Sequence, residues 1–226
     1  MIIQMYSLAN IDEAVKCAEL GVDHIGFAVG KDGIAPAELN YEEAAAMRKA
    51  LPPQTVASAL TVYDNVSEIL RMAELVQPDI LHVSSDLEVV AEDKLLELRR
   101  YLNPAIRIMK AIAVGTDRQS IRDVLRFMGY VDLILLDTKV SHVTGIGASG
   151  ATHDWNISRK IVEVSSKPVI LAGGLSAGNV AKAMRQVKPW AVDTFTHTSR
   201  SEDITRKDMA KVKAFIDAVR EAEERV

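Results

Sequence analysis

The stretch "NYEEAAAMRKALPPQTVASALTVYDNVSEILRMAELVQPDILHV", residues 40–83, decides the fold because it contains the unit that repeats along the chain. Apolar residues recur at helical spacing in residues 40–51 and 64–76, and short apolar runs rich in β-branched residues follow at 55–62 and 79–83. Strands that are apolar on both faces and are separated by helices indicate a parallel sheet covered by helices.

The same unit continues on both sides of this stretch. Further strands are predicted at residues 2–6, 22–29, 106–112, 131–136, 168–172 and 191–195, with helical segments between them. About eight such units in 226 residues predict one closed (β/α)8 TIM barrel, a single domain spanning residues 1–226. An open, doubly wound sheet is the alternative, but it usually has fewer strands and leaves two edges unpaired.

Composition limits the functions that are possible. The 27 basic and 31 acidic residues give a net charge of −4, so the chain lacks the basic footprint of a protein that binds nucleic acid or an anionic membrane. With Cys17 as the single cysteine, neither an internal disulfide nor a cysteine-rich zinc cluster can form. The N-terminus lacks the features of a signal peptide, and no apolar run approaches the ~20 residues of a membrane span. We therefore expect a cytoplasmic protein.

An acidic residue and a polar loop follow the sixth predicted strand, in "ILLDTKVSHVTGIGASGATHDW", residues 134–155. Loops after the strands of such a barrel converge on the face that carries active sites. At this rim, partial desolvation raises the pKa of a carboxyl group, so Asp137 is predicted to be a proton donor. The alternative is that Asp137 caps the loop or pairs with Lys139.

Two glycine clusters are predicted at the same rim. "GASG" at 147–150 and "LAGGLSAGN" at 171–179 expose backbone N–H groups, and the second leads into a helix N-terminus, as in phosphate-binding loops. The hydroxyl-rich "DTFTHTS", residues 193–199, follows the eighth strand. Together these segments favour a phosphate site, whereas the structural alternative is tight turns with close helix packing.

Four segments of the sequence resemble a known family. "LANIDEAVKCAELGVDHIGF", "ILLDT", "GASGATHDW" and "PVILAGGLSAGNVAKAM" are similar in order and spacing to phosphoribosylanthranilate isomerase, a ribulose-phosphate-binding type of barrel in tryptophan biosynthesis. The resemblance implies an Amadori rearrangement of an aminoaldose phosphate to a 1-amino-2-ketose, without metal or cofactor. It implies that Asp137 protonates the ring oxygen and that Gly173 and Gly174 help to bind the phosphate. We expect a monomer or a homodimer.

Departures from the family pattern cluster at the rim. The family's catalytic cysteine lies in a Lys-x-Cys-Gly stretch, and Tyr6 occupies its position in "QMYS". The arginine that contacts the anthranilate carboxylate is missing around Ala37, and His197 replaces a glycine in the phosphate loop. Without that base and that arginine, phosphoribosylanthranilate is predicted to be a poor substrate.

The predicted site falls into two groups. The catalytic residues are Asp137 and Tyr6. The substrate-binding residues are His82, Gly147, Ser149, Gly150, Gly173, Gly174, Thr196, His197, Thr198 and Ser199. Two alternatives remain, namely an inactive barrel that binds phosphate as a sensor or partner, and a metal-dependent sugar-phosphate epimerase that uses His82, His142 and His197.

Overall fold

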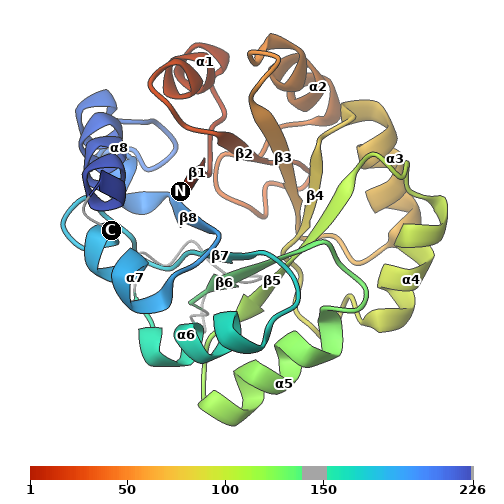
Figure 1. The fold of residues 1–226 in the computed structure, drawn as a ribbon. Coiled ribbons are helices and arrows are strands. Elements are labelled where there is room, and N and C mark those ends of the chain that lie inside the picture. The colour runs from red at the N-terminus through yellow and green to blue at the C-terminus, as the bar shows by residue number, and fades with distance from the viewer. Residues whose placement is uncertain (139–151, 225–226) are drawn as a thin grey trace.

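The computed structural model describes residues 1–138 and 152–224, and in this part of the chain eight parallel strands form a closed barrel in sequential order (Figure 1). The strands are β1 (Ile2–Met5), β2 (His24–Ala28), β3 (Val56–Thr61), β4 (Ile80–Val83), β5 (Arg107–Ala113), β6 (Leu133–Asp137), β7 (Val169–Leu171) and β8 (Ala191–Thr194). The predicted TIM barrel is confirmed.

Helices surround the barrel in a ring (Figure 1). They are α1 (Ile11–Glu19), α2 (Tyr41–Ala50), α3 (Val66–Val76), α4 (Glu92–Tyr101), α5 (Asp117–Phe127), α6 (Trp155–Val164), α7 (Val180–Val187) and α8 (Met209–Glu224). A short 3-10 helix, η1 (Thr196–Thr198), follows β8 and was not predicted. None of the described helices is long and apolar enough to cross a membrane.

Local signals in the sequence explain where several helices begin. Asn10, Asn40 and Asn65 are the N-cap residues of α1, α2 and α3. Each asparagine side chain accepts a hydrogen bond from the backbone N–H of a glutamate three positions later. This contact satisfies one of the N–H groups that a helix start leaves unpaired, so the Asn-x-x-Glu spacing fixes the first turn of each helix.

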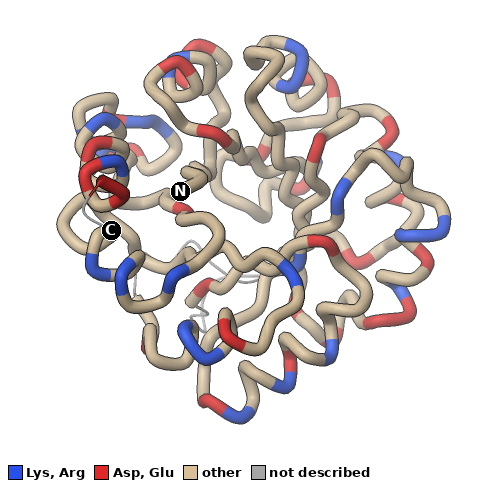
Figure 2. The backbone as a smooth tube through the Cα atoms, in the orientation of Figure 1, with Lys and Arg blue, Asp and Glu red and all other residues tan. Residues whose placement is uncertain are grey.

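The strands separate two apolar cores. The inner core fills the barrel and contains Tyr6, Ile80, Met109, Ala111, Leu133, Leu135, Ile170, Ala172 and Ala191. The outer core lies between strands and helices, and it includes the alternate strand residues, such as Ile108, Ile134 and Val192. Alternation therefore tells which strand residues face the barrel interior. Charged residues of both signs are spread over the helices (Figure 2).

The N-terminal end of the barrel repeats one polar contact before β2, β4 and β6. An aspartate just before each strand accepts a hydrogen bond from the N–H of the second residue of the preceding strand and pairs with an arginine from a helix. The contacts are Asp23 with Ile3 and Arg220, Asp79 with Ala57 and Arg48, and Asp132 with Ile108 and Arg99. These contacts tie neighbouring strands and outer helices together at the end opposite the loops that follow the strands.

Candidate active site

Asp137 is the last residue of β6 and lies half-buried at the C-terminal end of the barrel. Its side chain faces the interior because Leu135, two positions earlier, belongs to the inner core. Burial raises the pKa of Asp137 to about 7, although the N–H of Thr138, which donates to Oδ1 over 2.7 Å, acts in the opposite direction. Asp137 can therefore carry a proton near neutral pH.

Tyr6 follows β1 and is 6% exposed. Its ring lies so close to Gly26 that a Cβ at that position would come within 2.5 Å of it. The hydroxyl is 2.7 Å from Oγ of Ser58 and 2.6 Å from Nδ1 of His82. Burial holds the pKa of Tyr6 well above its usual value. This tyrosine is therefore a neutral hydrogen-bonding group rather than a base.

His82 extends this contact toward the barrel axis. It is 2% exposed, and its Nε2 atom is buried without a hydrogen-bond partner among the described residues. Burial, followed by the charge of Lys110, lowers the pKa of His82 to about 3, so the imidazole is neutral. A buried polar atom without a partner is rare in a folded protein and is available to a ligand.

The glycine turn after β7 has a packing role, in line with the structural alternative that the sequence left open. Gly173 and Gly174 have positive φ angles of 84° and 61°. A Cβ at Gly173 would come within 2.7 Å of Oγ1 of Thr138, so only glycine fits there. The Asn179 side chain donates to the carbonyl of Gly174 over 2.9 Å, and α7 begins only at Val180. The two glycines are therefore separated from the start of this helix.

In the turn after β8, Thr198 and Ser199, which are predicted to bind substrate, have hydrogen-bond partners within the protein. Both are 1% exposed, and both hydroxyls donate to the carbonyl of Phe195. Their N–H groups donate to Phe195 and Thr196. The buried ammonium group of Lys207 lies 3.4 and 3.3 Å from the two hydroxyl oxygens. The 3-10 turn thus directs the hydroxyls of Thr198 and Ser199 inward.

The remaining predicted residues are placed as follows. Thr196 is half-buried and His197 is exposed, so both lie on the outer side of the same turn. The predicted residues Gly147, Ser149 and Gly150 lie outside the described residues, as do His142 and Lys139. Within residues 1–138 and 152–224, no group of three His, Cys, Asp or Glu side chains is arranged to hold a metal ion.

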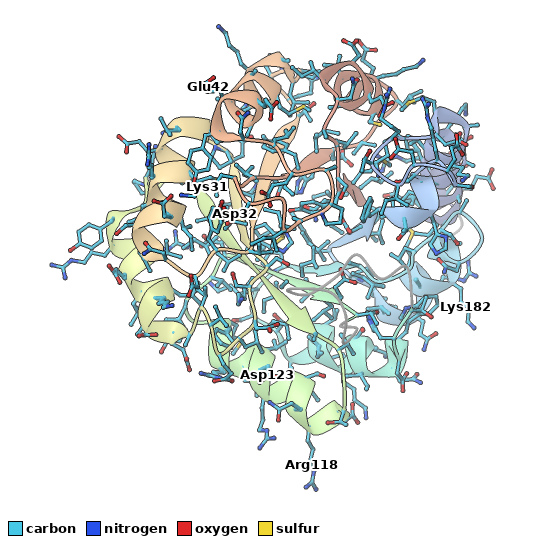
Figure 3. All side chains as sticks on the ribbon, turned by 180° about the vertical axis from the view of Figure 1, so that it is seen from behind. Lys31, Asp32, Glu42, Arg118, Asp123 and Lys182 are labelled. Carbon is cyan, nitrogen blue, oxygen red and sulfur yellow. The ribbon has the colours of Figure 1, made fainter. Side chains whose placement is uncertain are left out.

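The carboxylate of Glu38 holds the loop after β2 together through hydrogen bonds. The N–H groups of residues 32–35 all donate to the side chain of Glu38, over distances of 3.0, 2.8, 3.2 and 3.1 Å. Figure 3 shows that the loop with Lys31 and Asp32 lies inside the ring of helices. Ala37, near which the family's arginine is missing, has a positive φ of 58°.

Sequence reasoning missed Asp193, a buried residue of β8 whose Oδ1 accepts a hydrogen bond of 3.2 Å from Nε2 of Gln4. Burial and the nearby Asp137 raise the pKa of Asp193 to about 8. Strand alternation could have identified it, since Asp193 lies two positions after Ala191, which faces the barrel interior. Ser58 on β3 and the buried Lys207 could not be recognised without the structure.

A closed barrel with buried carboxyl groups at the C-terminal end of its strands defines an α/β-barrel enzyme. Residues 3–218 match the family described as N-(5'phosphoribosyl)anthranilate (PRA) isomerase. The chain is 32% identical to N-(5'-phosphoribosyl)anthranilate isomerase 1 of Methanosarcina mazei, over 96% of this chain and 94% of that protein. It is 34% identical to the Methanocella arvoryzae isomerase, over 92% and 93%.

Solved structures agree with these relatives. The phosphoribosyl anthranilate isomerase of Thermotoga maritima superimposes with a TM-score of 0.76 and 26% identity, over 98% of this chain and 100% of that chain. The chain therefore belongs to the PRA isomerase family, whose enzymes are intramolecular aldose–ketose isomerases.

Proposed function

We propose that this chain catalyses the Amadori isomerisation of a phosphorylated amino sugar, with Asp137 as the general acid that protonates the ring oxygen. The observation that carries the proposal is the position of Asp137 at the C-terminal end of β6, with a pKa raised to about 7 by burial. A general acid works best when its pKa lies near the working pH, because it then both holds and releases a proton.

We assign the substrate contacts from the hydrogen-bonding groups near the C-terminal end of the barrel. Backbone N–H groups of Gly173 and Gly174 would bind the phosphate, together with Thr196 and His197 from the turn after β8. Nε2 of His82, which has no hydrogen-bond partner within residues 1–138 and 152–224, would bind a sugar hydroxyl, and the Tyr6 hydroxyl would hold the imidazole ring in place. Gly147, Ser149 and Gly150 remain predicted phosphate or loop contacts. Thr198 and Ser199 would support the turn through Lys207 rather than contact the substrate.

We further propose that phosphoribosylanthranilate is a poor substrate and that an amine substituent other than anthranilate is preferred. The Tyr6 ring occupies the position of the family's cysteine base, and the loop of residues 30–38 uses its backbone donors on Glu38 instead of offering an arginine. A positioned base accounts for about 3–5 kcal/mol of barrier, and a charge-assisted hydrogen bond for about 1.5–3 kcal/mol. Tyr6→Cys alone should therefore restore little activity toward phosphoribosylanthranilate.

Steady-state kinetics on freshly generated phosphoribosylanthranilate test this substrate assignment. We expect a kcat/KM well below the ordinary enzyme range, and no complementation of a tryptophan auxotroph that lacks this isomerase. A kcat/KM of about 10⁵ M⁻¹s⁻¹ or more would contradict the substrate assignment but leave the reaction type intact. If phosphoribosylanthranilate proves to be a poor substrate, a panel of N-substituted 5-phosphoribosylamines would identify the preferred amine.

One observation favours a second candidate, an inactive barrel that binds phosphate as a sensor or partner. Tyr6 is fixed by Ser58 and His82 and has no charge to offer, so the position of the family base is filled without a base. Absence of turnover on the whole panel, together with retained affinity for phosphate, would support this candidate over the isomerase.

Other expectations accompany the proposal. We expect residues 1–226 to act as one domain, as a monomer or homodimer, in the cytoplasm, with a phosphorylated small molecule as the partner. Size-exclusion chromatography with light scattering would measure the oligomeric state.

A further inference from the structure

Asp137 and Asp193 lie on one row of the barrel. Leu136 of β6 is paired in register with Leu171 of β7, and Leu171 is paired with Val192 of β8. The next residue in each segment is Asp137, Ala172 and Asp193. Side chains at the same level of neighbouring strands point to the same face of the sheet. Ala172 belongs to the inner core, so the side chains of Asp137 and Asp193 also face the barrel interior.

Ala172 leaves space between the two carboxyl groups. Parallel strands lie about 4.8 Å apart, so the backbones of β6 and β8 are separated by roughly 10 Å. The intervening side chain is a single methyl group. Two inward carboxyl groups that flank a methyl group can face each other across a gap that accommodates a reacting carbon atom.

The electrostatics of the pair favour a shared proton. Burial raises the pKa of both groups, and the charge of Asp137 raises that of Asp193 further. Repelling carboxyl groups lose their protons in two separate steps, so between these steps the pair holds one proton. Among the described residues, the Gln4 amide on β1 and the Lys207 ammonium before α8 favour the ionised form of Asp193. The buried Tyr6 hydroxyl also lies within the electrostatic influence of Asp193 and stays neutral.

We propose that Asp193 is the general base that replaces the family's cysteine and removes the C2 proton, while Asp137 acts as the acid. The inference rests on the proposed isomerase function. The reactive form of the singly protonated pair has the proton on Asp137 and the charge on Asp193; the Gln4 amide and the Lys207 ammonium favour this form, whereas the higher pKa of Asp193 acts against it. The Gln4 side chain, which donates to Oδ1 of Asp193, is a positioning residue.

The reaction balances with these two groups alone. Asp137 gives its proton to the ring oxygen while the C1–O bond breaks and the nitrogen lone pair forms a C=N bond. Asp193 takes the proton from C2, the C2–H electron pair forms the C1=C2 bond, and the C=N pair returns to nitrogen. Asp193 then returns its proton to C1 while the C2 hydroxyl gives its proton to Asp137. This last step yields the 1-amino-2-ketose and restores both carboxyl groups.

The test compares Asp193→Asn with a matched variant, Asp123→Asn. Asp123 is a buried carboxyl on α5 with a pKa raised by burial, and it accepts a hydrogen bond from a glutamine, as Asp193 does. It lies in the outer ring of helices, away from the barrel axis (Figure 3). Wild type and variants are assayed on phosphoribosylanthranilate and on the N-substituted phosphoribosylamine that the wild type turns over fastest.

We expect Asp193→Asn to lower kcat about 10²–10⁴-fold and to lose the ascending limb of the pH profile, whereas Asp123→Asn keeps wild-type activity. In Asp193→Ala, formate should restore activity at least tenfold, because it supplies a carboxylate in the vacated space. With substrate deuterated at C2, the wild type should deliver part of the label to C1.

If Asp193→Asn retained more than a third of the wild-type kcat, the role of Asp193 as the base would be wrong, but the proposed isomerase function would stand. A folded Asp193→Ala that formate does not rescue would lead to the same conclusion. Absence of wild-type turnover on every phosphoribosylamine overturns the proposed function as well, so the two failures are distinguishable.

Discussion

The two ends of the barrel use the same residue type in opposite ways. At the N-terminal end, Asp23, Asp79 and Asp132 each accept a strand N–H and pair with an arginine. At the C-terminal end, Asp137 and Asp193 face the interior, and burial raises the pKa of both. Partners that compensate a carboxylate stabilise the fold, whereas a carboxyl group left with few partners retains a proton that chemistry can use.

The same difference separates two buried histidines. His24, the first residue of β2, directs Nδ1 to Oε1 of Gln4 over 3.3 Å, and its ring centroid lies 5.8 Å from that of Trp190. For His82, near the end of β4, the described part of the chain offers no partner to Nε2. Among the described residues, the buried histidine nitrogen that lacks a protein partner therefore lies at the C-terminal end of the barrel, where a ligand can bind it.

Asp137→Asn has the largest expected effect. The substitution keeps size and polarity but removes the proton, so kcat should fall about 10²–10⁴-fold, while phosphate affinity stays within about twofold. The free energy of unfolding at pH 8 should not fall, because the fold no longer has to accommodate a carboxylate that burial disfavours. Single-turnover kinetics and urea unfolding measure the two quantities separately. Full turnover by the variant would remove Asp137 from the mechanism.

The barrel could be predicted from the sequence because its signals are local. Helical and strand periodicity occur within short segments, and no strand boundary differs from the prediction by more than two residues. The Asn-x-x-Glu helix starts are equally local. Asp137 could be placed because it follows directly after a buried apolar run.

The contacts inside the site could not be predicted because they join distant segments. Gln4 and Asp193 are 189 positions apart, and Tyr6 meets His82 over 76 positions. Such contacts depend on barrel register, which composition and periodicity do not encode residue by residue. The inward turn of Thr198 and Ser199 depends on Lys207, which returns from a later loop.

Asp79→Ala tests the stabilising end of the comparison. It leaves the Ala57 N–H and the Arg48 guanidinium without their acceptor, so the free energy of unfolding should fall by about 2 kcal/mol. The kcat should stay within about twofold of wild type. Urea unfolding provides the measurement.

The matched control for Asp79→Ala is Asp217→Ala, which breaks an exposed ion pair with Lys213 on α8. It should cost less than about 0.5 kcal/mol, since exposed pairs contribute little. An equal loss in both variants would show that the aspartates before the strands have no special role.

His24→Gln tests whether the N-terminal end is sensitive to acid. Burial lowers the pKa of His24 from 6.5 to about 4, so the folded state binds fewer protons than the unfolded state between these values. The contribution of His24 to stability is therefore complete above pH 6.5 and is lost as the pH falls toward 4. Between pH 7.5 and 4.5, the wild type should lose about 1–2 kcal/mol more than the variant. Parallel pH curves for the two proteins would contradict this.

Glu38→Gln has the smallest expected effect and tests the C-terminal end without touching the carboxyl pair. The carboxylate accepts N–H groups from residues 32–35, and an amide side chain retains only one of its two acceptor oxygens. Losing these charge-assisted bonds should speed hydrogen exchange at residues 32–35 about tenfold, equivalent to ~1.4 kcal/mol, while strand amides stay unchanged. The matched control is Glu42→Gln, an exposed glutamate in the first turn of α2 that changes the net charge equally (Figure 3). If both variants speed exchange to the same degree, the effect comes from net charge and the loop does not depend on Glu38.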